Sequence, residues 1–146
     1  MGKVMLRTRL LHPEILGVLA RSGHGSRVLI ADGNYPFTTG SQPAAAKVFL
    51  NLMPGIAKVT DVLKALVEVI PIESAMVMTP PDGASQPIFD EFRQILPPGL
   101  DLTAKKRMEF YQEAKSPDTA LVIATGEQRR FANLLLTIGV VKEGQA

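Results

Sequence analysis

The stretch RVLIADGNYP, residues 27–36, decides the fold class of this sequence. Its first half is a short apolar run rich in branched side chains, which indicates a strand buried on both faces. Its second half combines Asp32, Gly33, Asn34 and Pro36, a dense turn signal that ends the strand. A buried strand of this kind needs other elements packed on both of its sides.

Helical and strand patterns alternate on either side of this stretch. Pro13 suits the first position of a helix, Gly23 is expected to end that helix in a left-handed conformation, and Thr60 is expected to cap the second helix. The alternation predicts a layered α/β domain. In all, helices are predicted over residues 12–22, 60–69, 87–96 and 103–115, and strands, besides the one at 27–31, over 47–52, 73–79, 119–124 and 133–141.

Composition excludes several classes of function. The chain has 146 residues, a length that suits one compact domain. It has no Cys, which excludes disulfides, thiolate nucleophiles and Cys-ligated metals. With His12 and His24 as the only histidines, no multi-histidine metal site is expected. The net charge of +2 is too small to indicate nucleic acid as the main partner.

The sequence also bears on location. Residues 1–6 contain no apolar core of the length that a signal peptide needs. No run of about 18 apolar residues occurs, so no membrane-spanning helix is expected. We therefore expect a cytoplasmic protein without a membrane partner.

Two loop residues are the first candidates for chemistry. His24 lies between Gly23 and Gly25, whose lack of side chains lets a ligand approach the backbone, and a loop imidazole is suited to proton transfer near neutral pH. The structural alternative is that His24 belongs to a helix C-cap. Asp32 follows the buried strand, at the end where ligands of open α/β sheets bind. Its structural alternative is that the carboxylate organises the turn.

Asn133 is the third candidate, with Arg129 and Arg130 just before it, and its structural alternative is a solvated turn. Known phosphate-binding and hydrolase motifs are absent. No glycine-rich phosphate loop and no Gly-x-Ser-x-Gly elbow occurs in the sequence.

Taken in order, several short segments resemble the ribose pyranase / fucose mutarotase family, and the resemblance spans essentially the whole chain. Arg107–Tyr111 is similar to the family's Arg-x-x-Phe-Tyr helix and favours the fucose mutarotase branch. The resemblance implies a single-domain layered α/β fold over residues 1–146 with a mostly parallel central sheet. The other similar segments are His12–Leu16, Gly23–Gly25, Leu29–Pro36, Ala124–Glu127, Phe131–Asn133 and Gly139–Val140.

The resemblance also implies an activity. Family members are isomerases that interconvert anomeric or ring forms of a free monosaccharide, here fucose- or ribose-like, without a metal or organic cofactor. His24 would be the catalytic acid/base, because an imidazole can take and give a proton near neutral pH. Asp32, Arg107, Phe131 and Asn133 would bind the sugar, with Arg107 offering several donors to adjacent oxygens.

The family further implies an assembly. Its members build closed homo-oligomeric rings, so we expect a decamer or a similar ring. The sugar site would lie at a subunit interface, completed by C-terminal residues.

Two residues depart from the family pattern, one of them Asn34, where fucose-type members often carry a different residue. Phe131 stands where the family usually has Tyr, and a phenyl ring packs but cannot pass a proton. The second acid/base group would then be Tyr111, Tyr35 or a water. This departure keeps alternative functions open: a non-catalytic sugar-binding or transport-accessory protein on the same fold, or a purely structural oligomer.

Overall fold

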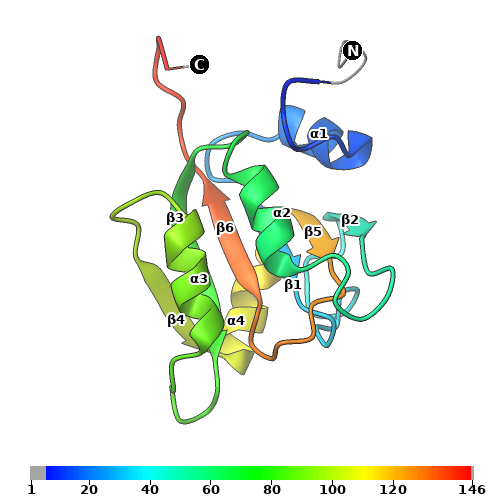
Figure 1. The fold of residues 1–146 in the computed structure, drawn as a ribbon, viewed down its shortest axis with the longest axis vertical. Coiled ribbons are helices and arrows are strands. Elements are labelled where there is room, and N and C mark those ends of the chain that lie inside the picture. Colours follow the sequence, from blue (N-terminus) through cyan, green and yellow to red (C-terminus); the bar gives the residue numbers. More distant parts are fainter. Residues whose placement is uncertain (1–5, 146) are drawn as a thin grey trace.

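The computed structural model describes residues 6–145 (Figure 1). Residues 1–5, which belong to the segment predicted to lack a signal peptide, and residue 146 lie outside the described residues. Within the described part of the chain, no helix is long and apolar enough to cross a membrane. The described elements are α1 (Pro13–Ala20), β1 (Arg27–Ala31), β2 (Ala46–Phe49), α2 (Val59–Leu66), β3 (Ile72–Thr79), α3 (Pro87–Ile95), β4 (Leu102–Lys106), α4 (Arg107–Ala114), β5 (Thr119–Ala124) and β6 (Leu134–Ile138).

The strands form one sheet in the order β2-β5-β1-β6-β3-β4. β6 is antiparallel to both of its neighbours, β1 and β3. The other neighbouring pairs are parallel, so β6 alone runs against the remaining strands. The expected layered α/β fold with a mostly parallel sheet is therefore confirmed.

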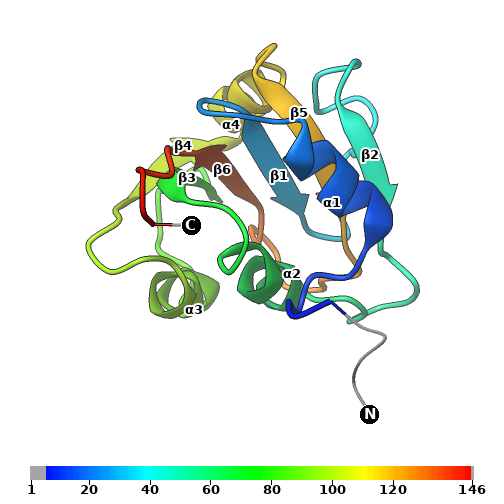
Figure 2. The ribbon, with the colours of Figure 1, turned by 90° about the horizontal axis from the view of Figure 1, so that it is seen from above.

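Helices cover both faces of this sheet (Figure 2). On one face α1, α2 and α3 bury residues such as Leu63 and Phe92 against Val28 of β1. On the other face α4 buries Phe110 against Leu29. Successive side chains of β1 thus contact different layers, which explains why its apolar run is unbroken.

The predicted helix over residues 103–115 is wrong in its first part. Leu102–Lys106 forms β4, which pairs in parallel with β3, and α4 begins only at Arg107. Pairing with β3 satisfies the backbone of this segment, and such tertiary pairing overrides local helical preference. Lys105 and Lys106 are typical of an edge strand, where charges discourage further pairing.

The predicted end of the first helix also differs. α1 is capped at Arg21, and Gly25 rather than Gly23 has the left-handed backbone, with φ of 88°. The left-handed residue therefore follows His24 and belongs to the turn that leads into β1. This result also removes the interpretation of His24 as part of the helix C-cap.

The second helix begins earlier than predicted. Its N-cap is Lys58, whose backbone N–H donates to the Asp61 carboxylate at 3.2 Å, so Thr60 lies inside the helix rather than capping it. The other predicted elements are present with ends shifted by a few residues, which is ordinary for boundaries predicted from sequence.

Candidate active site

Asp32 lies at the carboxyl end of β1 and is 2% exposed. Its carboxylate accepts the backbone N–H of Asn34 at 3.0 Å and that of Ala132 at 3.3 Å. Burial raises the pKa of Asp32, although these backbone N–H groups partly offset the effect. Asp32 therefore organises its turn, as the structural alternative predicts, and also fixes the loop before β6.

Asn133 joins the same two segments from the other side. Its Oδ1 accepts the backbone N–H of Asp32 at 2.7 Å, and the residue is 3% exposed. The interpretation of Asn133 as a solvated turn is therefore wrong. Two reciprocal side chain–backbone bonds hold the end of β1 against the start of β6, which is the antiparallel strand at the centre of the sheet.

A cavity of about 490 Å³ opens beside these residues, and we call it the β1–α4 cavity. It lies where β1 and β3 end and α4 begins, at the side of the sheet where ligands of α/β folds bind. The structure brings five of the six predicted site residues together here. The cavity is lined by Asp32, Asn34, Tyr35, Met78, Arg107, Tyr111, Arg130, Phe131 and Asn133.

Two tyrosines form an aromatic wall of the β1–α4 cavity. Tyr35 and Tyr111 meet edge to face, with ring centroids 5.3 Å apart. The Tyr35 hydroxyl donates to the Gly40 carbonyl at 2.6 Å, and burial raises the pKa of Tyr35 above its ordinary value. The Tyr35 hydroxyl is thus occupied by a hydrogen bond to the backbone, whereas the Tyr111 side chain is half-buried and reaches the surface. Of the two hydroxyls, that of Tyr111 is the better placed for chemistry.

Phe131 has an unusual backbone. Its φ is 59°, in the left-handed region that costs a residue with a Cβ roughly 1–3 kcal/mol. The Arg130 guanidinium lies 5.4 Å from the centre of its ring, in cation–π geometry. The next residue, Ala132, donates its backbone N–H to the Asp32 carboxylate, and this hydrogen bond holds the left-handed backbone of Phe131 in place.

A second network beside this cavity was not among the predicted site residues. Glu127 is 3% exposed and accepts bonds from the Arg129 guanidinium at 3.0 and 3.1 Å and from the Val59 backbone N–H at 3.3 Å. Burial opposes its ionisation, but the bonds from Arg129 lower the pKa of Glu127 overall. Thr125 donates to the Ala31 carbonyl at 2.7 Å. The sequence signal for this network is the Thr-Gly-Glu segment.

Gly126 in that segment has a packing role. A Cβ built on it would lie 2.4 Å from the carbonyl oxygens of Met53 and Ile56, so only glycine fits. Its carbonyl accepts the Gly55 N–H at 2.6 Å, which fastens the loop after β2.

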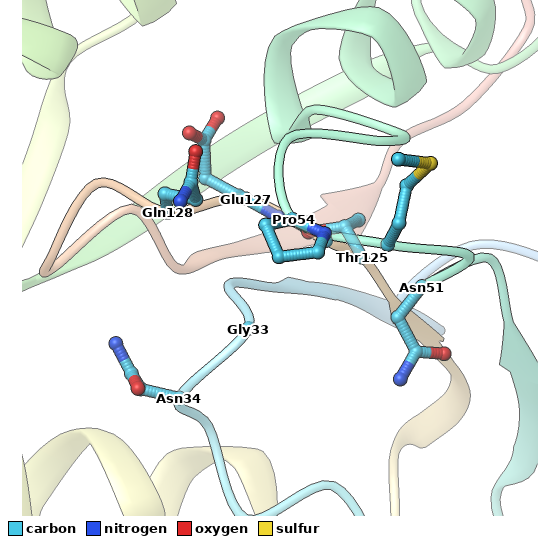
Figure 3. Close-up of a pocket in the computed structure, with 9 residues that line it drawn as sticks. Gly33, Asn34, Asn51, Pro54, Thr125, Glu127 and Gln128 are labelled. Carbon is cyan, nitrogen blue, oxygen red and sulfur yellow. Dashed lines mark hydrogen bonds between the residues drawn. The ribbon is translucent and has the colours of Figure 1, made fainter.

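This loop borders a further cavity of about 420 Å³ (Figure 3). Asn34 lines both this cavity and the β1–α4 cavity. Figure 3 shows Asn34 and Asn51 on opposite sides of the view and both apart from Glu127 and Gln128, so these side chains do not converge on one point.

His24, the predicted catalytic residue, lies elsewhere. It precedes β1, whereas Asp32 follows it, and a strand of five residues at about 3.3 Å per residue separates the two by roughly 15 Å or more. Its Nε2 lies 2.8 Å from a Glu73 carboxylate oxygen, and its side chain is 59% exposed. It lines a separate cavity of about 340 Å³, which we call the His24 cavity. A single chain therefore does not bring His24 together with the other predicted site residues.

Three comparisons with known proteins bear on this geometry. The RbsD / FucU transport protein family matches residues 5–141. The chain is 34% identical to a fucose mutarotase of Danio rerio over 143 residues, 90% of each chain, and 28% identical to a D-ribose pyranase of Clostridium perfringens over 137 residues, 94% of this chain and 99% of the other. The Bacillus subtilis RbsD structure complexed with D-ribose superposes with a TM-score of 0.79 at 27% identity, covering 94% of this chain and 100% of that one. These findings confirm the predicted family and class of enzyme.

Proposed function

Because the chain belongs to the RbsD / FucU transport protein family, we propose that it is a monosaccharide mutarotase. It interconverts anomeric or ring forms of a free fucose- or ribose-like sugar. The observation that carries the proposal is the β1–α4 cavity, which gathers Asp32, Arg107, Tyr111, Phe131 and Asn133 at one end of the sheet.

The residues around this cavity suit a small sugar. Arg107 presents several donors to adjacent hydroxyl oxygens, and the Asn133 amide can donate as well as accept. The Asp32 carboxylate accepts from hydroxyls when it is ionised. The rings of Tyr111 and Phe131 pack against the apolar C–H face of the sugar. The site thus combines a few polar groups with aromatic surface, as small-molecule sites commonly do.

The reaction needs two proton transfers. A base takes the proton of the anomeric hydroxyl, the electrons of that O–H bond form the carbonyl, and the bond from the anomeric carbon to the ring oxygen breaks. The ring oxygen takes a proton from an acid, and closure on either face of the carbonyl reverses these steps. In the proposal His24 is the base, and Tyr111 or a water is the acid. Such general acid–base help contributes about 10²–10⁴-fold to a rate.

The position of His24 requires a second copy of the chain. We place the His24 cavity of one subunit against the β1–α4 cavity of its neighbour, in a closed homo-oligomeric ring such as a decamer. Val140 and Val141, which line the His24 cavity, and Met108, which follows Arg107, are large apolar side chains exposed in the single chain. A neighbouring copy would cover these side chains, as exposed apolar surface at interfaces usually is.

Charge supports the same pairing. Arg107 and Arg130 line the β1–α4 cavity beside the buried Asp32, whereas the half-exposed Glu73 contacts His24 on the other surface. Opposite charges on the two surfaces would fix their register and discourage other pairings.

The test is anomeric exchange measured by NMR saturation transfer over a panel of free sugars, with His24→Ala as the control. We expect at least one sugar to exchange faster than in buffer and the variant to lose that acceleration. A panel in which every sugar exchanges at the buffer rate would contradict the proposal.

Phe131 favours a second candidate function, a sugar-binding or transport-accessory protein without catalysis. At the position where the family resemblance implies a Tyr, this chain has a phenyl ring that cannot transfer a proton. Calorimetry that detects sugar binding, together with exchange at the buffer rate, would select this candidate. Absence of both binding and exchange would leave a purely structural oligomer.

A further inference from the structure

The imidazole of His24, which lines the His24 cavity, has a carboxylate partner. This partner, Glu73, lies near the start of β3, far from His24 in sequence but 2.8 Å from its Nε2. Both side chains are about half exposed, so the pair adds little to stability and its geometry calls for another explanation.

The backbone around Glu73 is shaped to direct its side chain. In the pairing of β3 with β6, Ile72 lies opposite Ile138 and Ser74 lies opposite Thr137, so Glu73 is an extra residue in a β-bulge. Bulges interrupt the alternation of a strand and re-aim a side chain, and they recur beside active sites.

The surroundings of the pair leave room for this arrangement. A Cβ on Gly139 would lie 3.3 Å from the Cβ of Glu73, a tight contact, so the glycine makes space for the bulged residue. The Gly139 backbone N–H donates to the Pro71 carbonyl at 2.8 Å, which ties β6 to the start of β3.

The turn that carries His24 is also fixed. Gly25 donates its N–H to the Ile138 carbonyl at 2.9 Å, and Ser26 donates to the Gly23 carbonyl at 3.1 Å. The same end of β6 therefore anchors both the His24 turn and the Glu73 bulge. The other described residues that line the His24 cavity carry no titratable side chain: Leu19, Ser22, Gly23, Val69, Ile70, Pro71, Ile138, Gly139, Val140 and Val141.

We propose that Glu73 is a positioning residue for His24, holding the imidazole so that Nδ1 faces the sugar. This inference rests on the proposed function of His24. An ionised carboxylate only accepts hydrogen bonds, so Nε2 must carry the proton that it shares with Glu73. The lone pair of the neutral ring is then on Nδ1, which takes the anomeric proton. The carboxylate also stabilises the imidazolium that this transfer forms, as in other carboxylate–histidine pairs.

Two variants separate the parts of this role. Glu73→Gln keeps an acceptor for Nε2–H without the charge, and Glu73→Ala removes both. We expect kcat for anomeric exchange to be highest in the wild type, lower in Glu73→Gln and lowest in Glu73→Ala. The Ala variant should lose roughly tenfold or more, which is part of the rate that general acid–base catalysis contributes. KM should change little, because Glu73 holds the imidazole rather than the sugar. Glu68→Gln is the matched control, since Glu68 pairs with Arg9 on the surface.

The imidazole tautomer gives a readout that does not depend on activity. Long-range ¹H–¹⁵N spectra at alkaline pH should show the Nε2–H form for His24 in the wild type and a mixture of forms in Glu73→Ala. His12 is an internal reference, because its Nδ1 accepts the Ile15 N–H at 3.3 Å and the chain has two histidines.

The outcomes are distinct. An unchanged kcat in Glu73→Ala, or an unchanged His24 tautomer in that variant, overturns the inference, and so does an equal loss in Glu68→Gln. Thermal unfolding of each variant checks that the fold is retained. If no sugar exchanges faster with the wild type, the proposed function fails, and the tautomer spectra still decide whether Glu73 fixes the imidazole.

Discussion

The two ends of the central sheet are built differently. At the carboxyl end of β1, Asp32, Asn133 and Glu127 are buried, and each makes hydrogen bonds to backbone groups of another segment. At the amino end, His24 and Glu73 are about half exposed and bond to each other. One end is a network completed within the chain, and the other presents reactive groups outward.

This difference assigns different tasks to the two ends. Groups that must hold a sugar in one orientation gain from rigidity, because ordering them beforehand lowers the cost of binding. A group that must reach into another subunit has to remain exposed in its own. The proposed composite site accounts for both properties.

The largest expected effect is on catalysis at the amino end. His24→Ala should lower kcat for anomeric exchange by about 100-fold or more, the lower part of what an acid/base group contributes. Sugar binding measured by calorimetry should weaken much less than kcat falls, because the sugar contacts of the β1–α4 cavity are retained in this variant. If His24→Ala retains wild-type anomeric exchange, His24 is not the catalytic base.

Mixing two inactive variants tests whether the ends meet between subunits. His24→Ala removes the base, and Arg107→Ala removes a sugar contact at the other end. If the site is composite, co-assembled subunits mixed one to one should recover about a quarter of the wild-type activity, because random pairing restores both intact halves at that frequency. The variants assembled separately serve as controls. Mixed oligomers as inactive as the separate ones would place both halves within one chain.

Stability should respond more strongly at the carboxyl end. Glu127→Gln should lower the free energy of unfolding by about 1–3 kcal/mol at neutral pH. The neutral amide weakens the hydrogen bonds that the buried carboxylate accepts from the charged Arg129 guanidinium. Glu73→Gln, which alters an exposed pair, should cost about 0–1 kcal/mol. Urea unfolding of both variants measures the contrast, and equal losses would contradict it.

The effect of Glu127 should also depend on pH. Its pKa is lowered in the folded state, so its contribution is complete above the ordinary value of 4.5 and is lost as pH falls through the folded-state value. The gap between wild type and Glu127→Gln should therefore close in acid. Asp32, with a raised pKa, works in the opposite direction and lowers stability as pH rises. The difference between the two proteins, rather than either curve alone, is the quantity to compare.

Sequence patterns predicted the buried strands of the sheet better than its exposed edge strand. The apolar runs of β1 and β5 could be recognised because helices cover both faces of the sheet there. β4 could not be recognised, since most of its residues are exposed and its strand conformation comes from pairing with β3. Lys105 and Lys106 fit a solvated helix face as well as an edge strand.

Among the site residues, local sequence identified the positions but not their grouping. Asp32 and His24 are only eight residues apart, yet the strand between them places them at opposite ends of the sheet. The partnership of His24 with Glu73 could not be predicted, because it depends on a bulge formed by the pairing of β3 with β6. The pair of Glu127 with Arg129 is local in sequence, but the burial of Glu127 depends on the loop packed against Gly126.

The smallest expected effect concerns the hydroxyl that Phe131 lacks. Phe131→Tyr adds one hydroxyl at the wall of the β1–α4 cavity, and a hydrogen bond worth about 1 kcal/mol would change kcat/KM by about fivefold. Phe and Tyr bear the same cost of the left-handed backbone, so the comparison isolates the hydroxyl. Tyr111→Phe is the reciprocal variant and should lower kcat if Tyr111 is the acid. A gain at position 131 without a loss at position 111 would instead assign that proton to water.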